Sequence, residues 1–174
     1  MFSNAAIIPT GNELISGIIK DTDSPAMMSL LLELNPCAQV TRHTPAADQK
    51  SSIASSISEC VSEGFDLIIL IGGSGEGHRH SSILGEDYTH SSMESVLETK
   101  LSTKLYGKNG HMWSELVIGT IGDSLIFNVP GPYQEAISTL KAFADHYQIE
   151  KKDQDIPAIH SAMVQALKTC YGEL

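Results

Sequence analysis

The sequence has 174 residues, of which 41% are hydrophobic, enough for one globular domain with a substantial core. Acidic residues outnumber basic ones by 21 to 11, and no Lys/Arg cluster interrupts the net charge of −10, which argues against nucleic acid or an anionic membrane as a partner. Three scattered cysteines show no metal-type spacing, and their odd number argues against a disulfide framework. The chain shows no signal peptide and no apolar stretch of the roughly 20 residues that span a bilayer, so we expect a cytoplasmic protein.

Strand-like and helix-like segments alternate along the first half of the chain. The apolar run 5–8 predicts a first strand, and a helix with apolar residues at helical spacing follows from about Ser24. Residues 38–43 predict a second strand, and Asp48 is expected to cap the next helix. Residues 66–71 place five apolar residues behind an Asp, which predicts a strand buried on both faces of a parallel sheet.

The second half predicts a helix, a hairpin and two further helices. In order, these are residues 91–101, the strands 115–121 and 124–129 around Gly122 and Asp123, a helix opened by Pro132, and a last helix from Pro157. The alternation predicts a three-layer α/β/α fold with a mostly parallel sheet and one hairpin. We expect a main domain over residues 1–149, with a charged linker and a C-terminal helix, residues 150–174, packed on it.

Glycine-containing turns follow three of the predicted strands, at residues 9–13, 72–77 and 130–132. Residues 72–77 hold four glycines, which let the backbone turn sharply and leave N–H groups uncovered for a phosphate or another anion. A tight turn without a ligand is an equally good interpretation of that loop alone. Because ligands bind outside the carboxyl ends of parallel strands, the three turns together predict one crevice.

Several residues in and near these turns are candidate ligand contacts. They are Thr10, Gly11, Asn12, Glu13, Gly72, Gly73, Ser74, Gly75, Gly77, Arg79, Lys108, Pro130, Gly131 and Pro132. For Ser74, Arg79 and Lys108 the alternative is a side chain that bonds its own loop or faces solvent. Although His78, His80 and His90 lie close together in the sequence, no further ligand has suitable spacing, and we predict no metal site.

In this order, the motifs resemble the molybdopterin-binding domain family, which includes MogA and MoaB proteins, the catalytic domain of MoeA and the N-terminal domain of CinA-type proteins. The matching segments are residues 8–14 with Gly17 and 21–23, residues 67–77, Gly107 with Lys108, and residues 127–132 with Glu135 and Ala136. The resemblance spans residues 6 to about 145. It implies a three-layer α/β/α fold with a pterin or nucleotide phosphate in the crevice. Family enzymes adenylylate molybdopterin or insert molybdate, using Mg²⁺ and acidic residues.

This sequence departs from the family pattern at several acidic positions. His80 stands where the family loop usually has an Asp, and Asn12 stands where an acidic residue is common. Ala46 and Ala47 replace the usual acids before the second helix, which leaves Asp48. Imidazole suits a hard Mg²⁺ ion less well than a carboxylate does, so a role for Mg²⁺ is doubtful. Asp48 and His80 are the candidate catalytic groups in a site that has lost several carboxylates.

The resemblance therefore implies a molybdopterin-binding-like protein tied to molybdenum cofactor biosynthesis or handling, with molybdopterin or a related pterin or nucleotide as its ligand. Turnover stays an open question; an active form would be a molybdopterin adenylyltransferase or a molybdotransferase-like enzyme. The alternatives are a nucleotide phosphoanhydride hydrolase or transferase of CinA type, or a structural, oligomer-forming domain. We also expect a homo-oligomer, either a dimer or a trimer.

Overall fold

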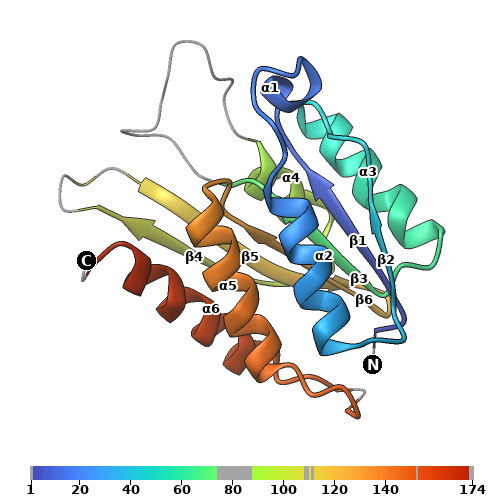
Figure 1. Ribbon diagram of the computed structural model, residues 1–174. Helices are drawn as coiled ribbons and strands as arrows, with labels where there is room; N and C mark the ends of the chain where they lie inside the picture. Colours follow the sequence, from blue (N-terminus) through green and yellow to red (C-terminus); the bar gives the residue numbers. More distant parts are fainter. Residues whose placement is uncertain (1, 74–87, 108–109, 111, 152, 173–174) are drawn as a thin grey trace.

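The computed structural model describes residues 2–73, 88–107, 110, 112–151 and 153–172, and its centre is a six-stranded sheet (Figure 1). The strands are β1 (Asn4–Pro9), β2 (Gln39–Arg42), β3 (Leu67–Ile71), β4 (Thr99–Tyr106), β5 (Met112–Ile121) and β6 (Ser124–Val129). Their spatial order is β2-β1-β3-β6-β5-β4. The first three and β6 are parallel, whereas β5 runs antiparallel to both of its neighbours.

Helices cover both faces of the sheet. They are α1 (Asn12–Ile15), α2 (Asp23–Leu34), α3 (Lys50–Ser62), α4 (Thr89–Val96), α5 (Tyr133–His146) and α6 (Ile156–Cys170). Figure 1 shows α2, α5 and α6 side by side over one face, with α3 and α4 on the other. This arrangement confirms the predicted three-layer α/β/α fold with a mostly parallel sheet.

Alternation along the strands divides the apolar side chains between two cores. Ile7, Ile69 and Phe127 are partners across adjacent strands and lie in the core under α2, α5 and α6. Ile8 and Ile68 belong to the opposite core, under α3 and α4. All five residues of β3 are buried, as expected for a parallel strand covered on both faces. The last helix contributes to the first of these cores in the same way as α5.

Two local predictions were wrong. The helix predicted over residues 91–101 ends at Val96, because Leu97 is extended and the chain enters β4 at Thr99. Pairing of β4 with β5 overrides the helical spacing of the apolar residues in this segment. Gly119 makes that pairing possible, because a β-carbon on residue 119 would lie 1.9 Å from the Thr99 carbonyl oxygen. Asp48 does not cap α3, whose N-cap residue is Gln49.

The predicted hairpin between β5 and β6 is confirmed. Ile121 pairs with Ser124, and the turn between them places Gly122 at a φ of 55°. Within the described residues, none of the helices combines the length and the apolar character needed to cross a bilayer.

Candidate functional site

The turns after β1, β3 and β6 lie at one edge of the sheet, because these three strands are adjacent and parallel. The Thr10 amide donates to the Ile71 carbonyl at 3.0 Å, and the Gly72 amide donates to the Val129 carbonyl at 2.8 Å. The starts of the turns are therefore hydrogen-bonded side by side, in the arrangement that the sequence predicted for a shared crevice.

The Thr10 hydroxyl joins this edge to α4. It donates to the Ile71 carbonyl at 2.8 Å and lies 2.8 Å from the Thr89 hydroxyl. Since a hydroxyl carries one proton, Thr89 is the donor to Thr10. A β-carbon on Gly72 would lie 2.2 and 2.3 Å from the two hydroxyl oxygens. Thr10 thus links the carboxyl edge of the sheet to α4, and its hydroxyl already makes hydrogen bonds within the protein.

The first turn is fastened to the loop before α3. The Asn12 amide donates to a carboxylate oxygen of Asp48 at 2.9 Å, and the Asp48 amide donates to the Asn12 side-chain oxygen at 3.3 Å. The Glu13 side chain folds back over Gly11. If residue 11 carried a β-carbon, that atom would lie 2.6 Å from Oε1 of Glu13. Gly11 has a φ of 139°, a conformation that favours glycine. Asp48 therefore positions the turn, while Glu13 stays at its surface.

Asn128 anchors the glycine turn from inside the sheet. Its fully buried amide nitrogen donates to the carbonyls of Gly72 and Glu115, both at 2.9 Å, and its oxygen accepts the Val117 amide at 2.7 Å. Gly73 has a φ of 91°, and a β-carbon there would lie 2.3 Å from the Asn128 nitrogen. Bulky residues at Gly73 would therefore disturb the fold itself. Sequence reasoning missed Asn128, although a polar residue within an apolar strand was its signal.

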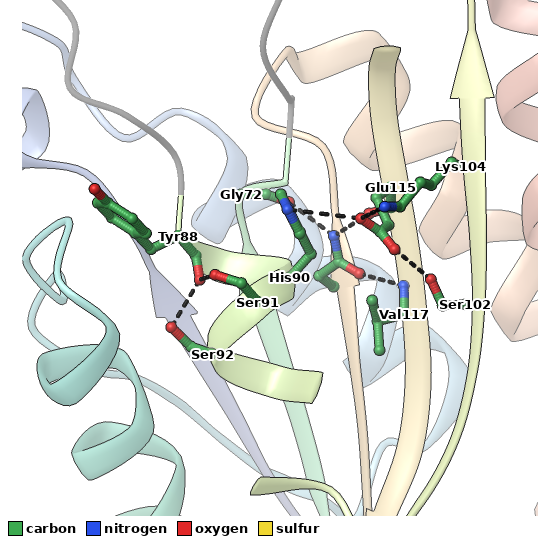
Figure 2. Close-up of polar contacts among 10 residues, drawn as sticks. Gly72, Tyr88, His90, Ser91, Ser92, Ser102, Lys104, Glu115 and Val117 are labelled. Carbon is green, nitrogen blue, oxygen red and sulfur yellow. Dashed lines mark hydrogen bonds and ion pairs between the residues drawn. The ribbon is translucent and has the colours of Figure 1, made fainter. Parts of the chain in front are cut away.

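A buried carboxylate, that of Glu115, lies close to the glycine turn (Figure 2). Glu115 on β5 is 1% exposed, and its Oε1 accepts a 2.5 Å hydrogen bond from the Ser102 hydroxyl on β4. Its Oε2 lies 3.6 Å from Nε2 of His90 and 3.9 Å from Nζ of Lys104. The Glu115 amide also donates to the Gly73 carbonyl at 3.1 Å, which ties this group to the glycine turn. The sequence alone does not point to Glu115 or Lys104, and it offers His90 only as a potential metal ligand.

The third turn leads into α5 and is braced by the last helix. Pro132 is the N-cap residue of α5, and Glu135 is a buried residue in its first turn. The Tyr171 hydroxyl donates to Glu135 at 2.8 Å and accepts from the Ser114 hydroxyl at 2.7 Å. The Tyr171 ring also meets Trp113 edge-on, with centroids 4.9 Å apart. Tyr171 follows directly on α6, so the end of that helix supports the start of α5.

Residues 21–23 lead into α2, whose first residue is Asp23, and Asp21 and Asp23 have opposite pKa shifts. Burial acts to raise the pKa of Asp21, but hydrogen bonds from Ser24 and the nearby Arg42 guanidinium hold that pKa below its ordinary value. Arg42 Nε donates to Asp21 at 2.7 Å. Burial, assisted by the charge of Asp21, raises the pKa of Asp23. The segment thus ties α2 to β2.

Cys60 lies beside His43 but is no activated thiol. The sulfur is 3.6 Å from Nε2 of His43, and the side chain is fully buried in the core under α3. Burial, together with the charges of Glu63 and Glu59, raises the pKa of Cys60 to about 12. The thiolate that a nucleophile needs is therefore scarce at neutral pH.

Six predicted site residues lie outside the described part of the chain. They are Ser74, Gly75, Gly77, Arg79, His80 and Lys108. Among the residues that the structure does describe, no group of three or more His, Cys, Asp and Glu side chains is arranged to hold a metal ion. The described side chains therefore do not assemble a Mg²⁺ site by themselves.

The fold and the turns at the carboxyl edge of the sheet together indicate a class of protein. A parallel α/β sheet with several turns converging at its carboxyl edge is the usual framework of a small-molecule-binding domain. The chain belongs to the family described as "Probable molybdopterin binding domain", which matches residues 6–149. This result confirms the family resemblance.

The chain is also similar to individual proteins. It is 38% identical over 69 residues to a CinA-like protein from Anaeromyxobacter sp. (strain K), a match that covers 40% of this chain and 16% of that protein. Its fold resembles that of a molybdopterin biosynthesis protein from Mycobacterium abscessus, with a TM-score of 0.66, 18% identity and coverage of 97% of this chain and 98% of the other. The CinA protein from Thermoplasma acidophilum gives a TM-score of 0.63 at 18% identity, over 82% of this chain and 96% of the other.

Proposed function

We propose that this protein binds a molybdopterin-type pterin, or a nucleotide through its phosphate, in the biosynthesis or handling of the molybdenum cofactor. The observation that carries the proposal is the family match combined with the meeting of the turns at Thr10, Gly72 and Pro130 at one sheet edge. The N-terminus of α5 begins at the same edge, and the positive end of a helix dipole favours an anion. This local potential matters in a chain whose net charge is −10.

Within this site, we propose that Gly11, Asn12, Glu13, Gly131 and Pro132 contribute ligand contacts from the first and third turns. The residues of the central turn that lie outside the described ranges complete the proposed set. Thr10 and Asn128 have a different role, because their polar atoms hold the edge in shape.

We propose binding without rapid turnover. The Asp48 carboxylate accepts the Asn12 amide, so it already serves to hold the first turn. His80 stands at the position where the family usually has a carboxylate. The test is Mg²⁺-dependent adenylyl transfer from ATP to molybdopterin by the wild type and by His80→Asp. Rates of about 1–1000 per second for the wild type, the range typical of enzymes, would contradict this part of the proposal.

A phosphoanhydride hydrolase or transferase of CinA type is the second candidate, favoured by the 38% identity over 69 residues to the CinA-like protein. The two functions predict different reactions with nucleotides. Release of a nucleoside monophosphate from a dinucleotide pyrophosphate supports the second. Tight pterin binding without such release supports the first.

Native mass spectrometry of protein purified from its own host tests the proposal directly, because it reads the retained ligand and the subunit count together. We expect a pterin or nucleotide mass and a homo-oligomer. The exposed isoleucines in and after α1 (Ile15, Ile18 and Ile19, which are 54%, 67% and 45% exposed) favour a surface that another subunit covers.

Calorimetric titration with molybdopterin and with AMP completes the test. Asn12→Ala should weaken binding about tenfold, since it removes a proposed polar contact and the side-chain bond to Asp48. Ser58→Ala is the matched control, because its exposed hydroxyl only donates to a carbonyl within α3. If no ligand is retained and the wild type binds neither compound, the proposed function is wrong.

A further inference from the structure

Glu115 and His90 lie directly behind the glycine turn. The Glu115 amide donates to the Gly73 carbonyl, and Thr89, the residue before His90, lies so close to Gly72 that an added β-carbon there would be 2.3 Å from its hydroxyl oxygen. Figure 2 shows His90 and Lys104 reaching the Glu115 carboxylate from opposite sides. Any anion at the Gly72–Gly73 turn is therefore a neighbour of this cluster.

The cluster contains two buried atoms that lack a hydrogen bond. Among the described residues, neither Oε2 of Glu115 nor Nδ1 of His90 has a hydrogen-bond partner. Leaving such atoms without a hydrogen bond in a protein interior is unfavourable, especially for a carboxylate oxygen. The distance of 3.6 Å between Nε2 and Oε2 is just too long for a hydrogen bond.

One added proton and one anion would satisfy both atoms. A neutral imidazole has a single N–H, whereas the imidazolium ion has two. In the charged form, Nε2–H can donate to Oε2 of Glu115 while Nδ1–H donates to an oxygen of a bound phosphate. The His90 side chain keeps 17% of its surface exposed, but Nδ1 itself is buried, so a phosphate meets this nitrogen only after a local shift of the ring or its neighbours.

The charges around His90 come from several elements. Glu115 on β5 and Lys104 on β4 bring one charge of each sign, and the Lys104 side chain is 53% exposed. Lys50 at the start of α3 lies with its ammonium 6.0 Å from the centroid of the Tyr88 ring, and α4 itself carries Glu94 one turn after His90. Because Lys104 already balances Glu115, protonation of His90 would give the group a positive charge suited to an anion.

We propose that His90 and Glu115 form a proton-linked phosphate subsite beside the Gly72–Gly73 turn, where binding of the anion is accompanied by uptake of one proton from solvent by His90. Glu115 is the positioning residue, since it holds the ring and stabilises its charge, and Lys104 supplements the positive potential. The inference rests on the proposed function, because it places the phosphate of the bound pterin or nucleotide at this turn. No bond other than the N–H bond is formed.

The test is calorimetric titration with inorganic pyrophosphate and with AMP at pH 7.5, in two buffers that differ in ionisation enthalpy. Because the two buffers release different heats when they give up a proton, proton uptake on anion binding appears as a difference between the two measured binding enthalpies. For the wild type we expect uptake approaching one proton per bound anion. His90→Gln should bind roughly tenfold more weakly, the size expected from loss of a hydrogen bond between charged groups, and without uptake. Glu115→Gln should reduce the uptake.

His146→Gln is the matched control, because His146 is an exposed histidine near the end of α5. It should keep both the affinity and the proton uptake of the wild type. Nitrogen-15 spectra of the wild-type histidines give a readout that needs no variant: on saturation with pyrophosphate, both ring nitrogens of His90 should carry protons.

Each outcome separates this inference from the proposed function. Anion binding without proton uptake, uptake that persists in His90→Gln, or a His90 ring that stays neutral at saturation overturns the subsite and leaves the proposed function standing. If the wild type binds neither pyrophosphate, AMP nor molybdopterin, both are overturned.

Discussion

Replacing Asn128 by alanine should remove the internal anchor of the glycine turn. The substitution leaves the Gly72 and Glu115 carbonyls and the Val117 amide without their side-chain partner, at a position with no solvent exposure. Each buried polar group that loses its partner costs about 1–1.5 kcal/mol, so the free energy of unfolding should fall by about 3–4 kcal/mol. In a domain of this size that loss lowers Tm by roughly 10 °C.

Urea unfolding followed by circular dichroism measures this loss, and the second readout is affinity for molybdopterin or AMP. Asn35→Ala is the matched control: Asn35 is also buried, and it donates to the Phe2 carbonyl at 2.7 Å and accepts the Cys37 amide at 3.2 Å. It should lose about 2 kcal/mol of stability without any change in affinity. A loss below about 1 kcal/mol for Asn128→Ala, or equal loss of affinity in both variants, would refute the assignment of Asn128 as the anchor.

Three further predictions concern other parts of the structure. Gly72→Ala places a methyl group against two threonine hydroxyls and should lower the unfolding free energy by about 1–3 kcal/mol; a neutral result in urea unfolding would show that the threonines move aside. Burial lowers the pKa of His160, so the unfolded chain binds protons more readily than the folded one, and stability is lost as pH falls through about 6.5. His160→Phe should flatten the dependence of the unfolding free energy on pH between about pH 7.5 and 5. An unchanged slope of that free energy against pH would contradict the reasoning. Tyr171→Phe removes the hydroxyl between Glu135 and Ser114 and should cost about 1–2 kcal/mol with little change in β-sheet content, whereas a change below about 0.3 kcal/mol would show that water replaces it.

The sequence predicts the sheet well where one strand carries its own signal. Residues 67–71 are apolar at every position, and the turn at Gly122 has a two-residue hairpin pattern, so both appear in the structure nearly as expected. The β4 strand was missed because its pairing depends on a partner distant in the sequence and on the small size of Gly119. Local helical spacing could not reveal that contact.

In the candidate site, too, features with a local sequence signal were predicted, and features that depend on distant partners were not. The turns at Thr10, Gly72 and Pro130 were found, since each follows an apolar strand. Asn128 and Glu115 were not found, because a polar residue in a strand shows its partners only when the register of the neighbouring strand is known. Asp48 was assigned to the wrong partner for a related reason: its carboxylate meets Asn12, which is 36 residues away in the sequence.

The β4 strand has a consequence for how copies of this protein can meet. Within the described residues β4 pairs with β5 and forms one border of the sheet, and most of its eight residues are exposed. An uncovered border of this kind invites another chain to add a strand, which is a common route to aggregation. Lys100 and Lys104 stand on it, and joining two copies border to border would bring their ammonium groups together. Lysines on an edge strand therefore disfavour the addition of a further strand at this border.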